Sequence, residues 1–238
     1  MPMINYAHRG ASERCPENTL WAFYAALEMG ANGIETDIQR TKDGVLVLFH
    51  DNTLARVTGD ARSVLDCTYD QLCAMDFGRF KGDKFAGERI VTLETFLRHF
   101  GRRGLALALE IKQPGIAQDI LAQVDATRSR TGMTITSFHW DSLLALRQID
   151  ADIPCGLLTD EPITHALLDR LEAPNIRQVC PKIANATAEQ VDLAQKRGFS
   201  IRYWGVQNEV LMRKALALGG DGMTVDFPDR LALALHGA

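Results

Sequence analysis

Short runs of β-branched and apolar residues alternate with longer amphipathic stretches along almost the whole chain. This alternation predicts βα units, in which a helix connects each strand to the next parallel strand. The predicted strands are 3–8, 33–38, 105–111, 133–138, 154–158, 177–181, 200–205 and 222–225. The predicted helices are 18–30, 92–102, 115–129, 140–149, 162–172, 187–197, 208–218 and 228–236. Eight strands and eight helices in 238 residues predict a TIM (β/α)₈ barrel.

One segment interrupts this rhythm. Residues 45–49 also read as a strand, but only Thr41-Lys-Asp-Gly44 separates them from the preceding strand. A parallel crossover needs about a dozen residues or more, so we expect a β-hairpin, with Asp43-Gly44 as its turn signal. Residues 52–91 show too little apolar periodicity for a core of their own. We therefore expect a single TIM-barrel domain, 1–238, with a small insertion, 52–91, over the active face.

Charge and composition exclude several classes of partner. The net charge is −4 and no basic cluster occurs, which argues against nucleic-acid partners. The chain has no apolar run near the roughly 18 residues of a membrane span and no signal-peptide pattern at its start. The five cysteines include no Cys-x-x-Cys pair and are interpreted as reduced thiols. We expect a cytoplasmic protein without a membrane anchor.

Charged residues gather at four strand ends, which is where TIM barrels carry their reactive groups. These ends are His8-Arg9-Gly10, Glu35-Thr36-Asp37, His50-Asp51 and Glu110-Ile111-Lys112. Alternate residues of a strand point to the same face, so Glu35 and Asp37 share one face. Glu110 and Lys112 likewise share a face with small alanines, opposite to the leucines that suit packing under helices.

The hairpin adds His50 to this group if its turn is short. A two-residue turn, at Asp43-Gly44 or Lys42-Asp43, places His50 opposite Asp37 or Glu35. A three-residue loop with a bulge at Gly44 would shift this parity.

The strand-end residues together suggest phosphoryl chemistry. Three carboxylates at one mouth, Glu35, Asp37 and Glu110, repel one another unless a cation neutralises them. Oxygen ligands suit a hard ion such as Mg²⁺ or Ca²⁺ better than zinc. Nearby cationic side chains would hold an anionic group, and two histidines would act as general base and general acid. Each motif alone is weak, because a lone Glu-x-Asp or a solvated ion pair is usually structural.

The chain resembles the glycerophosphodiester phosphodiesterase family, of the cytoplasmic bacterial type, over nearly its whole length. The matching elements are His8-Arg9-Gly10, Pro16-Glu17-Asn18-Thr19, Glu35-Thr36-Asp37, Asp43-Gly44, Phe49-His50-Asp51, Thr92-Leu93-Glu94, Leu109-Glu110-Ile111-Lys112, Ser137-Phe138, Trp204, Asp221-Gly222 and Asp226-Phe227-Pro228. The resemblance implies a barrel of the phospholipase C-like phosphodiesterase type. Cys15, Val91 and Gly205 depart from the family's usual residues and affect only the expected shape of the pocket.

The resemblance also implies roles for individual residues. One divalent metal ion is predicted, either Mg or Ca, with Mn as an alternative. Its predicted ligands are Glu35, Asp37 and Glu110. The predicted acid/base residues are His8 and His50. The predicted substrate contacts are Arg9 and Lys112 at the phosphate and Trp204 at the glycerol pocket.

The implied reaction is metal-dependent hydrolysis of glycerophosphodiesters to sn-glycerol 3-phosphate and an alcohol, in phospholipid head-group turnover. It proceeds through attack by the glycerol 2-hydroxyl to form a cyclic phosphate intermediate, which water then opens. A lysophospholipase D that takes long-chain lysolipids is one alternative, and it would need an apolar channel. A non-catalytic barrel that binds phosphodiesters is another. Supporting roles are expected for Glu17, Asn18 and Asp51, and His139 is a candidate for substrate contact.

Overall fold

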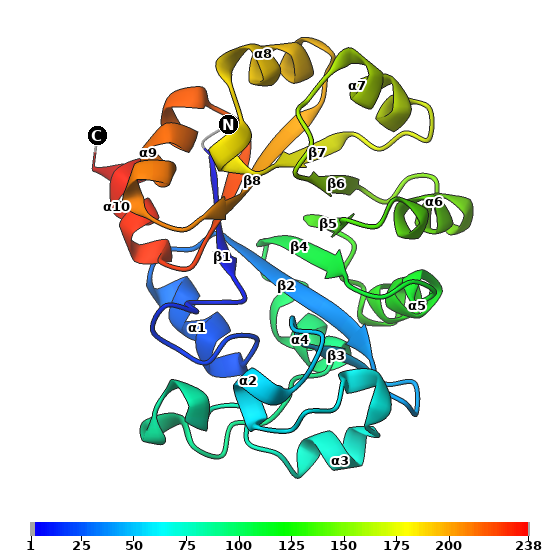
Figure 1. Ribbon diagram of the computed structural model, residues 1–238, viewed down its shortest axis with the longest axis vertical. Coiled ribbons are helices and arrows are strands. Elements are labelled where there is room, and N and C mark those ends of the chain that lie inside the picture. Colours follow the sequence, from blue (N-terminus) through cyan, green and yellow to red (C-terminus); the bar gives the residue numbers. More distant parts are fainter. Residues whose placement is uncertain (1–2, 238) are drawn as a thin grey trace.

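The computed structural model describes residues 3–237. Within that range eight parallel strands form a barrel: β1 (Ile4–His8), β2 (Gly33–Arg40), β4 (Ala106–Ile111), β5 (Met133–Ser137), β6 (Cys155–Thr159), β7 (Gln178–Pro181), β8 (Ser200–Val206) and β9 (Gly222–Val225). Neighbours in sequence are neighbours in space, and β9 pairs with β1 to close the barrel (Figure 1). The predicted TIM barrel is confirmed.

Eight helices surround these strands in the described part of the chain (Figure 1). They are α1 (Leu20–Glu28), α4 (Leu93–Phe100), α5 (Ala117–Thr127), α6 (Trp140–Ile149), α7 (His165–Glu172), α8 (Ala188–Lys196), α9 (Glu209–Leu218) and α10 (Pro228–His236). Five begin after a capping side chain that accepts a hydrogen bond from a first-turn N–H: Thr19, Thr92, Thr164, Thr187 and Asn208. Among residues 3–237, no helix has both the length and the apolar character needed to cross a membrane.

The main core lies between the barrel and this ring of helices. Leu107, Leu109 and Ile111 of β4 belong to it, as the alternation along that strand predicts. Phe96 and Phe100 of α4 are fully buried in the same cluster, with ring centroids 5.2 Å apart. The outward face of β4 is therefore used for packing, which leaves its inward face free for polar residues.

The predicted β-hairpin is confirmed, and its loop is the longer of the two alternatives. Strand β3 (Leu46–Leu48) pairs antiparallel with β2, and the N–H of Thr41 donates to the carbonyl of Val45. The loop therefore has three residues and ends at Gly44, whose φ of 90° suits glycine. Of the two predicted alternatives, the three-residue loop at Gly44 is the one present, and this register places Phe49, not His50, opposite Asp37.

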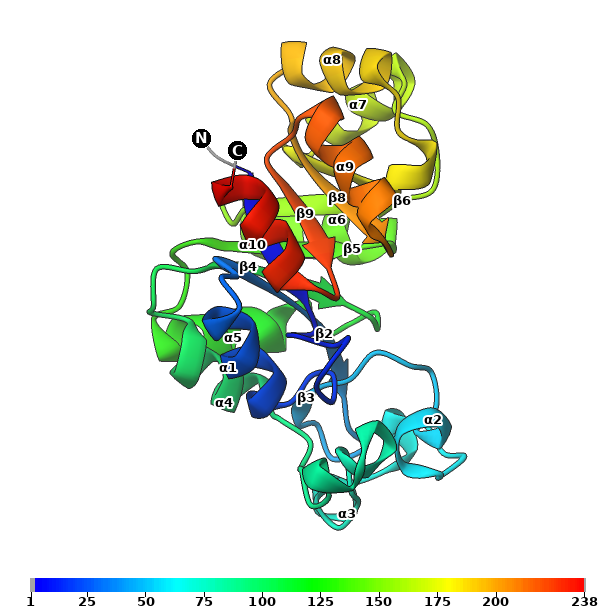
Figure 2. The same cartoon turned by 90° about the vertical axis from the view of Figure 1, so that its left-hand side faces the viewer.

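Residues 52–91 form a lobe beside the barrel, seen at the bottom of Figures 1 and 2. The lobe contains α2 (Ala55–Thr58), α3 (Tyr69–Cys73) and three 3₁₀ turns, Val64–Asp66, Arg79–Lys81 and Asp83–Phe85. Its apolar residues form a second buried cluster: Val47, Phe49, Leu54, Val57, Val64, Cys67, Leu72, Phe77 and Ile90. The segment thus has a buried cluster that its apolar periodicity did not predict, and it shares this cluster with the hairpin. Short turns space the apolar residues of this segment irregularly, so the sequence shows no helical or strand period there. Two members of the cluster, Val47 and Phe49, come from β3 and the residue after it.

Gly10 makes a close contact that should be sensitive to substitution. Its φ is +87°, and an added Cβ would lie 2.5 Å from the carbonyl carbon of Ala22 in α1. Gly10→Ala should therefore lower the free energy of unfolding by roughly 2–5 kcal/mol, from backbone strain and overpacking together. Gly44→Ala is the matched control, because no described atom lies within 4 Å of its added Cβ and only strain of about 1–2 kcal/mol is expected. Urea denaturation measures both, and equal losses would contradict the close contact.

Candidate active site

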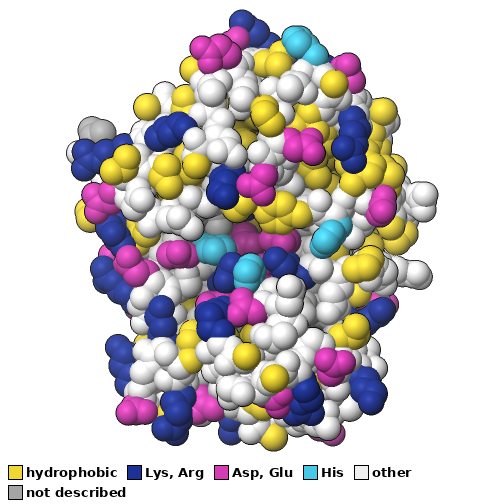
Figure 3. All heavy atoms as spheres, viewed as in Figure 1, with side chains coloured by type: hydrophobic (Ala, Val, Ile, Leu, Met, Phe, Trp, Pro, Cys, Tyr) yellow, Lys and Arg dark blue, Asp and Glu magenta, His cyan; other side chains and the backbone are white. Residues whose placement is uncertain are grey.

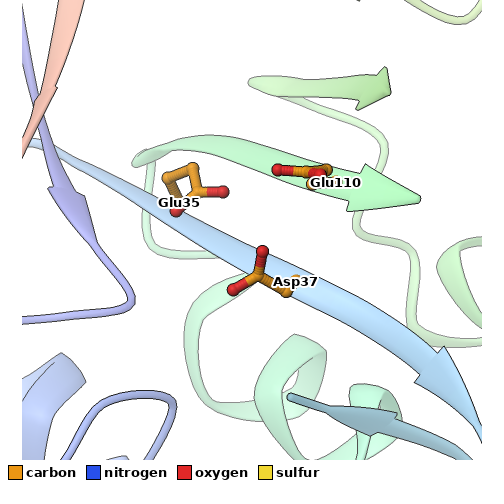
Figure 4. A group of neighbouring side chains, drawn as sticks. All are labelled: Glu35, Asp37 and Glu110. Atoms are coloured by element: carbon orange, nitrogen blue, oxygen red, sulfur yellow. The ribbon is translucent and has the colours of Figure 1, made fainter. Parts of the chain in front are cut away.

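Three acidic side chains meet at the carboxyl ends of β2 and β4. Asp37 is the direct register partner of Glu110, and Glu35 lies two residues earlier on the same face of β2. One carboxylate oxygen from each lies within 4.8 Å of the others, and all three residues are buried (Figure 4). The predicted set of acidic residues is therefore brought together by adjacent strands.

The triad has the properties of a site for a divalent metal ion. Among the described residues, Glu35 Oε2 and Asp37 Oδ1 are buried oxygens without a hydrogen-bond partner. Burial, together with the charge of Asp37, raises the pKa of Glu110 to about 7. A cation would satisfy these oxygens and relieve the repulsion. The donor set consists of carboxylate oxygens, which suit a hard divalent ion.

Two cations flank the triad, and both come from the predicted positions. Arg9 Nε lies 3.1 Å from Asp37 Oδ2, and Arg9 Nη1 donates to Glu17 Oε1 at 2.9 Å. Lys112 Nζ lies 2.9 Å from Glu110 Oε1 and 3.7 Å from Asp37 Oδ1. Each cation is mostly buried and keeps further N–H groups for an anionic ligand.

Each predicted histidine is held by a carboxylate at Nδ1. His8 Nδ1 lies 2.6 Å from Asp226 Oδ1, and His50 Nδ1 lies 2.8 Å from Asp51 Oδ1. A partner at Nδ1 fixes the ring and leaves Nε2 as the nitrogen free to exchange a proton. In His8, Nε2 faces the triad, 3.9 Å from Glu35. Burial and Arg9 lower the pKa of His8, but Asp226 and Glu35 raise it more, so the pKa lies above its usual value.

His50 reaches the site even though the turn argument for it failed. Strand β3 ends at Leu48, so strand alternation no longer applies at residue 50. Gln39, buried on β2, donates through Nε2 to the carbonyls of Phe49 at 2.9 Å and Asp51 at 3.0 Å. These two bonds hold the chain on both sides of His50, which lines the same cavity as His8.

The cavity has a volume of about 240 Å³ and opens at the barrel mouth. Figure 3 shows acidic, basic and histidine side chains gathered at the centre of this face. The lining residues are His8, Arg9, Glu35, His50, Glu110, Lys112, Phe138, Leu158, Arg202, Trp204, Gly205, Val206, Gln207, Thr224 and Asp226. Asp37 is buried behind this surface, and His139 is not among the lining residues.

One wall of the cavity is aromatic. The rings of Trp204 and Phe138 lie perpendicular to each other, with centroids 5.0 Å apart. Trp204 Nε1 donates to the carbonyl of Thr159 at 3.2 Å, which fixes the indole at the end of β8. This wall offers an apolar surface beside the charged groups.

Sequence reasoning missed Arg202 and gave Asp226 no role. Arg202 is fully buried inside the barrel and donates to Thr224 Oγ1 at 2.6 Å and Thr136 Oγ1 at 3.3 Å. Its position two residues before Trp204 is the signal that would have placed it on the inward face of β8. Asp226 follows β9 and reaches His8 across 218 residues of sequence.

Asn18 supports the triad from the start of the first helix. Its side-chain amide donates to Asp37 Oδ2 at 3.2 Å, and its amide oxygen accepts from Thr36 Oγ1 at 2.8 Å. Asn18 is itself buried. The expected supporting role of this residue thus corresponds to orienting Asp37.

Comparisons with known proteins point to one family. The sequence profile described as "Glycerophosphoryl diester phosphodiesterase family" matches residues 8–230. The "Glycerophosphodiester phosphodiesterase" of Caldanaerobacter subterraneus subsp. tengcongensis is 35% identical over 240 residues, which cover 97% of each chain.

Solved structures share the fold over almost the full length. A phosphodiesterase of Oleispira antarctica, determined in complex with the product sn-glycerol-3-phosphate, has a TM-score of 0.87 at 25% identity, covering 98% of this chain and 97% of that one. A glycerophosphodiester phosphodiesterase of Agrobacterium tumefaciens has a TM-score of 0.86 at 26% identity, covering 98% and 99%. The chain therefore belongs to the glycerophosphoryl diester phosphodiesterase family.

Proposed function

We propose that this protein hydrolyses glycerophosphodiesters to sn-glycerol 3-phosphate and an alcohol. The observation that carries the proposal is that two carboxylate-held histidines, His8 and His50, line one cavity with a buried acidic triad and two cations. The product bound to the Oleispira antarctica relative supports the choice of substrate. We place the reaction in phospholipid head-group turnover.

The metal would be one divalent ion, Mg²⁺ or Ca²⁺ and alternatively Mn²⁺, held by Glu35, Asp37 and Glu110. When bound, such an ion withdraws electron density from a phosphoryl oxygen. The phosphate oxygens would take hydrogen bonds from Arg9 and Lys112. Both side chains are already oriented by carboxylates, so they need little reordering when the substrate binds.

The two histidines would share the proton transfers. In the first step, one Nε2 would take the proton of the glycerol 2-hydroxyl as its oxygen attacks phosphorus and forms a cyclic phosphate, and the other Nε2 would protonate the departing alcohol oxygen. In the second step, water would open the cyclic phosphate: the Nε2 that gave up its proton would take one from the water, and the other Nε2 would return its proton to the glycerol 2-oxygen, which releases glycerol 3-phosphate. Asp226 and Asp51 keep the Nδ1 proton in place during these transfers. The glycerol carbons would lie against Trp204 and Phe138, which exclude water from that side of the cavity.

Two further proposals concern the whole chain. We propose one domain, 1–238, with 52–91 as an insertion, because the cluster inside the insertion includes Val47 of β3 and so joins the lobe to the barrel. We also propose a cytoplasmic location. All five cysteines, which lie in the described part of the chain, are free thiols, and this state suits a reducing compartment.

The test is release of glycerol 3-phosphate from glycerophosphocholine by the purified protein. Turnover should stop in EDTA and return when Mg²⁺, Ca²⁺ or Mn²⁺ is added back. A long-chain lysophosphatidylcholine, assayed beside it, should react much more slowly. Faster turnover of the lysolipid would favour a lysophospholipase D, whereas tight binding of the diester without turnover would favour a binding protein.

A further inference from the structure

Arg56, in the first helix of the insertion, joins two hydrogen-bonded pairs that each include a residue lining the cavity. Its guanidinium donates to Asp51 through Nε at 2.7 Å and Nη2 at 3.1 Å. It also donates to Glu17 through Nη1 at 2.7 Å and Nη2 at 2.8 Å. One side chain thus makes two bidentate pairs, the strongest geometry for a guanidinium and a carboxylate.

Both carboxylates have a second partner in the site. Asp51 Oδ1, which accepts from Arg56, also holds His50 Nδ1 at 2.8 Å. Glu17 Oε1, which accepts from Arg56, also accepts from Arg9 Nη1 at 2.9 Å. The path from His50 to Arg9 therefore runs through Arg56 and consists entirely of charge-assisted bonds.

The environment of these groups favours a role in positioning. Glu17 and Arg9 are 15% and 14% exposed at the side chain, so their bonds are partly shielded from water. The Arg56 side chain, 46% exposed, lies with its guanidinium carbon 5.7 Å from the Phe80 ring centroid on the insertion side. Without Arg56, Asp51 and Glu17 would each lose a bidentate partner and would be free to rotate, together with the groups that they hold.

We propose that Arg56 is a positioning residue through which the insertion holds the acid/base histidine His50 and the phosphate-binding Arg9 in one fixed geometry. Arg56 does not line the cavity, and its hydrogen bonds go to Asp51 and Glu17, through which it acts. This inference rests on the proposed function for the roles of His50 and Arg9. The insertion then contributes to the geometry of the site as well as to its shape.

The first test uses Arg56→Ala, Arg56→Lys and the control Arg62→Ala. Arg62 lies in the same insertion with a similarly exposed side chain, and its guanidinium pairs with Asp60 away from the site. Arg56→Ala should lower kcat/KM roughly 10–100-fold, the usual effect of removing a group that orients a reacting residue. The kcat/KM of Arg56→Lys should lie between those of Arg56→Ala and the unchanged protein, because an ammonium group keeps the charge but cannot make two bidentate pairs. Arg62→Ala should stay within about twofold of the unchanged protein, as for an exposed ion pair.

Chemical rescue separates positioning from a general role in stability. Guanidinium chloride at low millimolar concentration should restore turnover of Arg56→Ala in a saturable manner, and sodium chloride at equal ionic strength should not. Arg62→Ala should show no response. A loss of activity in Arg56→Ala that follows a lowered Tm and is not rescued would overturn the proposal. Activity of Arg56→Ala equal to that of Arg62→Ala would overturn it too.

NMR of the histidine side chains tests the positioning role of Arg56 without any substrate, and so independently of the proposed function. In protein labelled with ¹⁵N-histidine, the ring-nitrogen signals of His50 should shift in Arg56→Ala and stay unchanged in Arg62→Ala. The signals of His165, exposed on α7, should stay unchanged in both variants. Unchanged His50 signals in Arg56→Ala would overturn the positioning role. A wild-type protein that fails to turn over any diester would instead overturn the proposed function alone.

Discussion

Glu110→Gln is expected to lower kcat by about a thousandfold, which corresponds to about 4 kcal/mol of transition-state free energy. The substitution keeps the size of the side chain but removes one of three carboxylates that lie within 4.8 Å of one another. It also removes the partner of Lys112 Nζ at 2.9 Å, so a phosphate-binding cation loses its orientation. Initial rates on glycerophosphocholine with saturating Mg²⁺ or Mn²⁺ measure the effect.

Metal binding can be measured without turnover. A ligand that binds only the folded state at 100 times its Kd stabilises that state by about 2.7 kcal/mol, so Mn²⁺ should raise the Tm of the unchanged protein. Glu110→Gln should abolish most of that rise. The control is Glu189→Gln, which changes an exposed residue on α8 and should leave both the metal-dependent rise in Tm and the value of kcat unchanged. If Glu110→Gln kept the metal-dependent rise in Tm together with normal kcat, the acidic triad would not be the metal site.

His50→Gln and His8→Gln should each lower kcat by about 10²–10⁴-fold, the range for loss of a general acid or base. Glutamine is similar to histidine in size and polarity but cannot carry a proton between substrate and solvent near neutral pH. The expected loss appears in kcat with a smaller change in KM, because the aromatic wall and the two cations still bind the substrate. Steady-state kinetics with the same diester measures both constants.

The control for the histidine variants is His165→Gln on α7, whose side chain is exposed and far in sequence from either site histidine. Its kinetics should match those of the unchanged protein. Activity of His50→Gln within about threefold of the unchanged protein would show that another group performs that proton transfer. The double variant of His8 and His50 should then retain most of the activity of His8→Gln.

Much of the fold and several site residues could be predicted from local patterns. Strand alternation places Leu109 and Glu110 on opposite faces of β4, and the structure has Leu109 in the core and Glu110 at the mouth. The same alternation puts Glu35 and Asp37 on one face of β2. These features depend on neighbours one or two residues away, so the sequence carries them directly.

The hairpin and the insertion show where local patterns stop. Whether the loop after Thr41 has two or three residues depends on the conformation that Gly44 adopts, and glycine permits several. The apolar residues of 52–91 have no regular period because short turns carry them to one cluster. Only the packed structure shows that they form a buried core.

The amino-acid sequence by itself determined the barrel, the strand ends that carry charge and the acidic and basic residues found there. The tertiary structure decided which of those residues have partners. Asp226 meets His8 from 218 residues away, and Arg56 meets Glu17 from 39 residues away. Such contacts depend on how strands close into a ring and how the insertion packs beside it, because hydrogen bonds form between groups near in space whatever their separation along the chain.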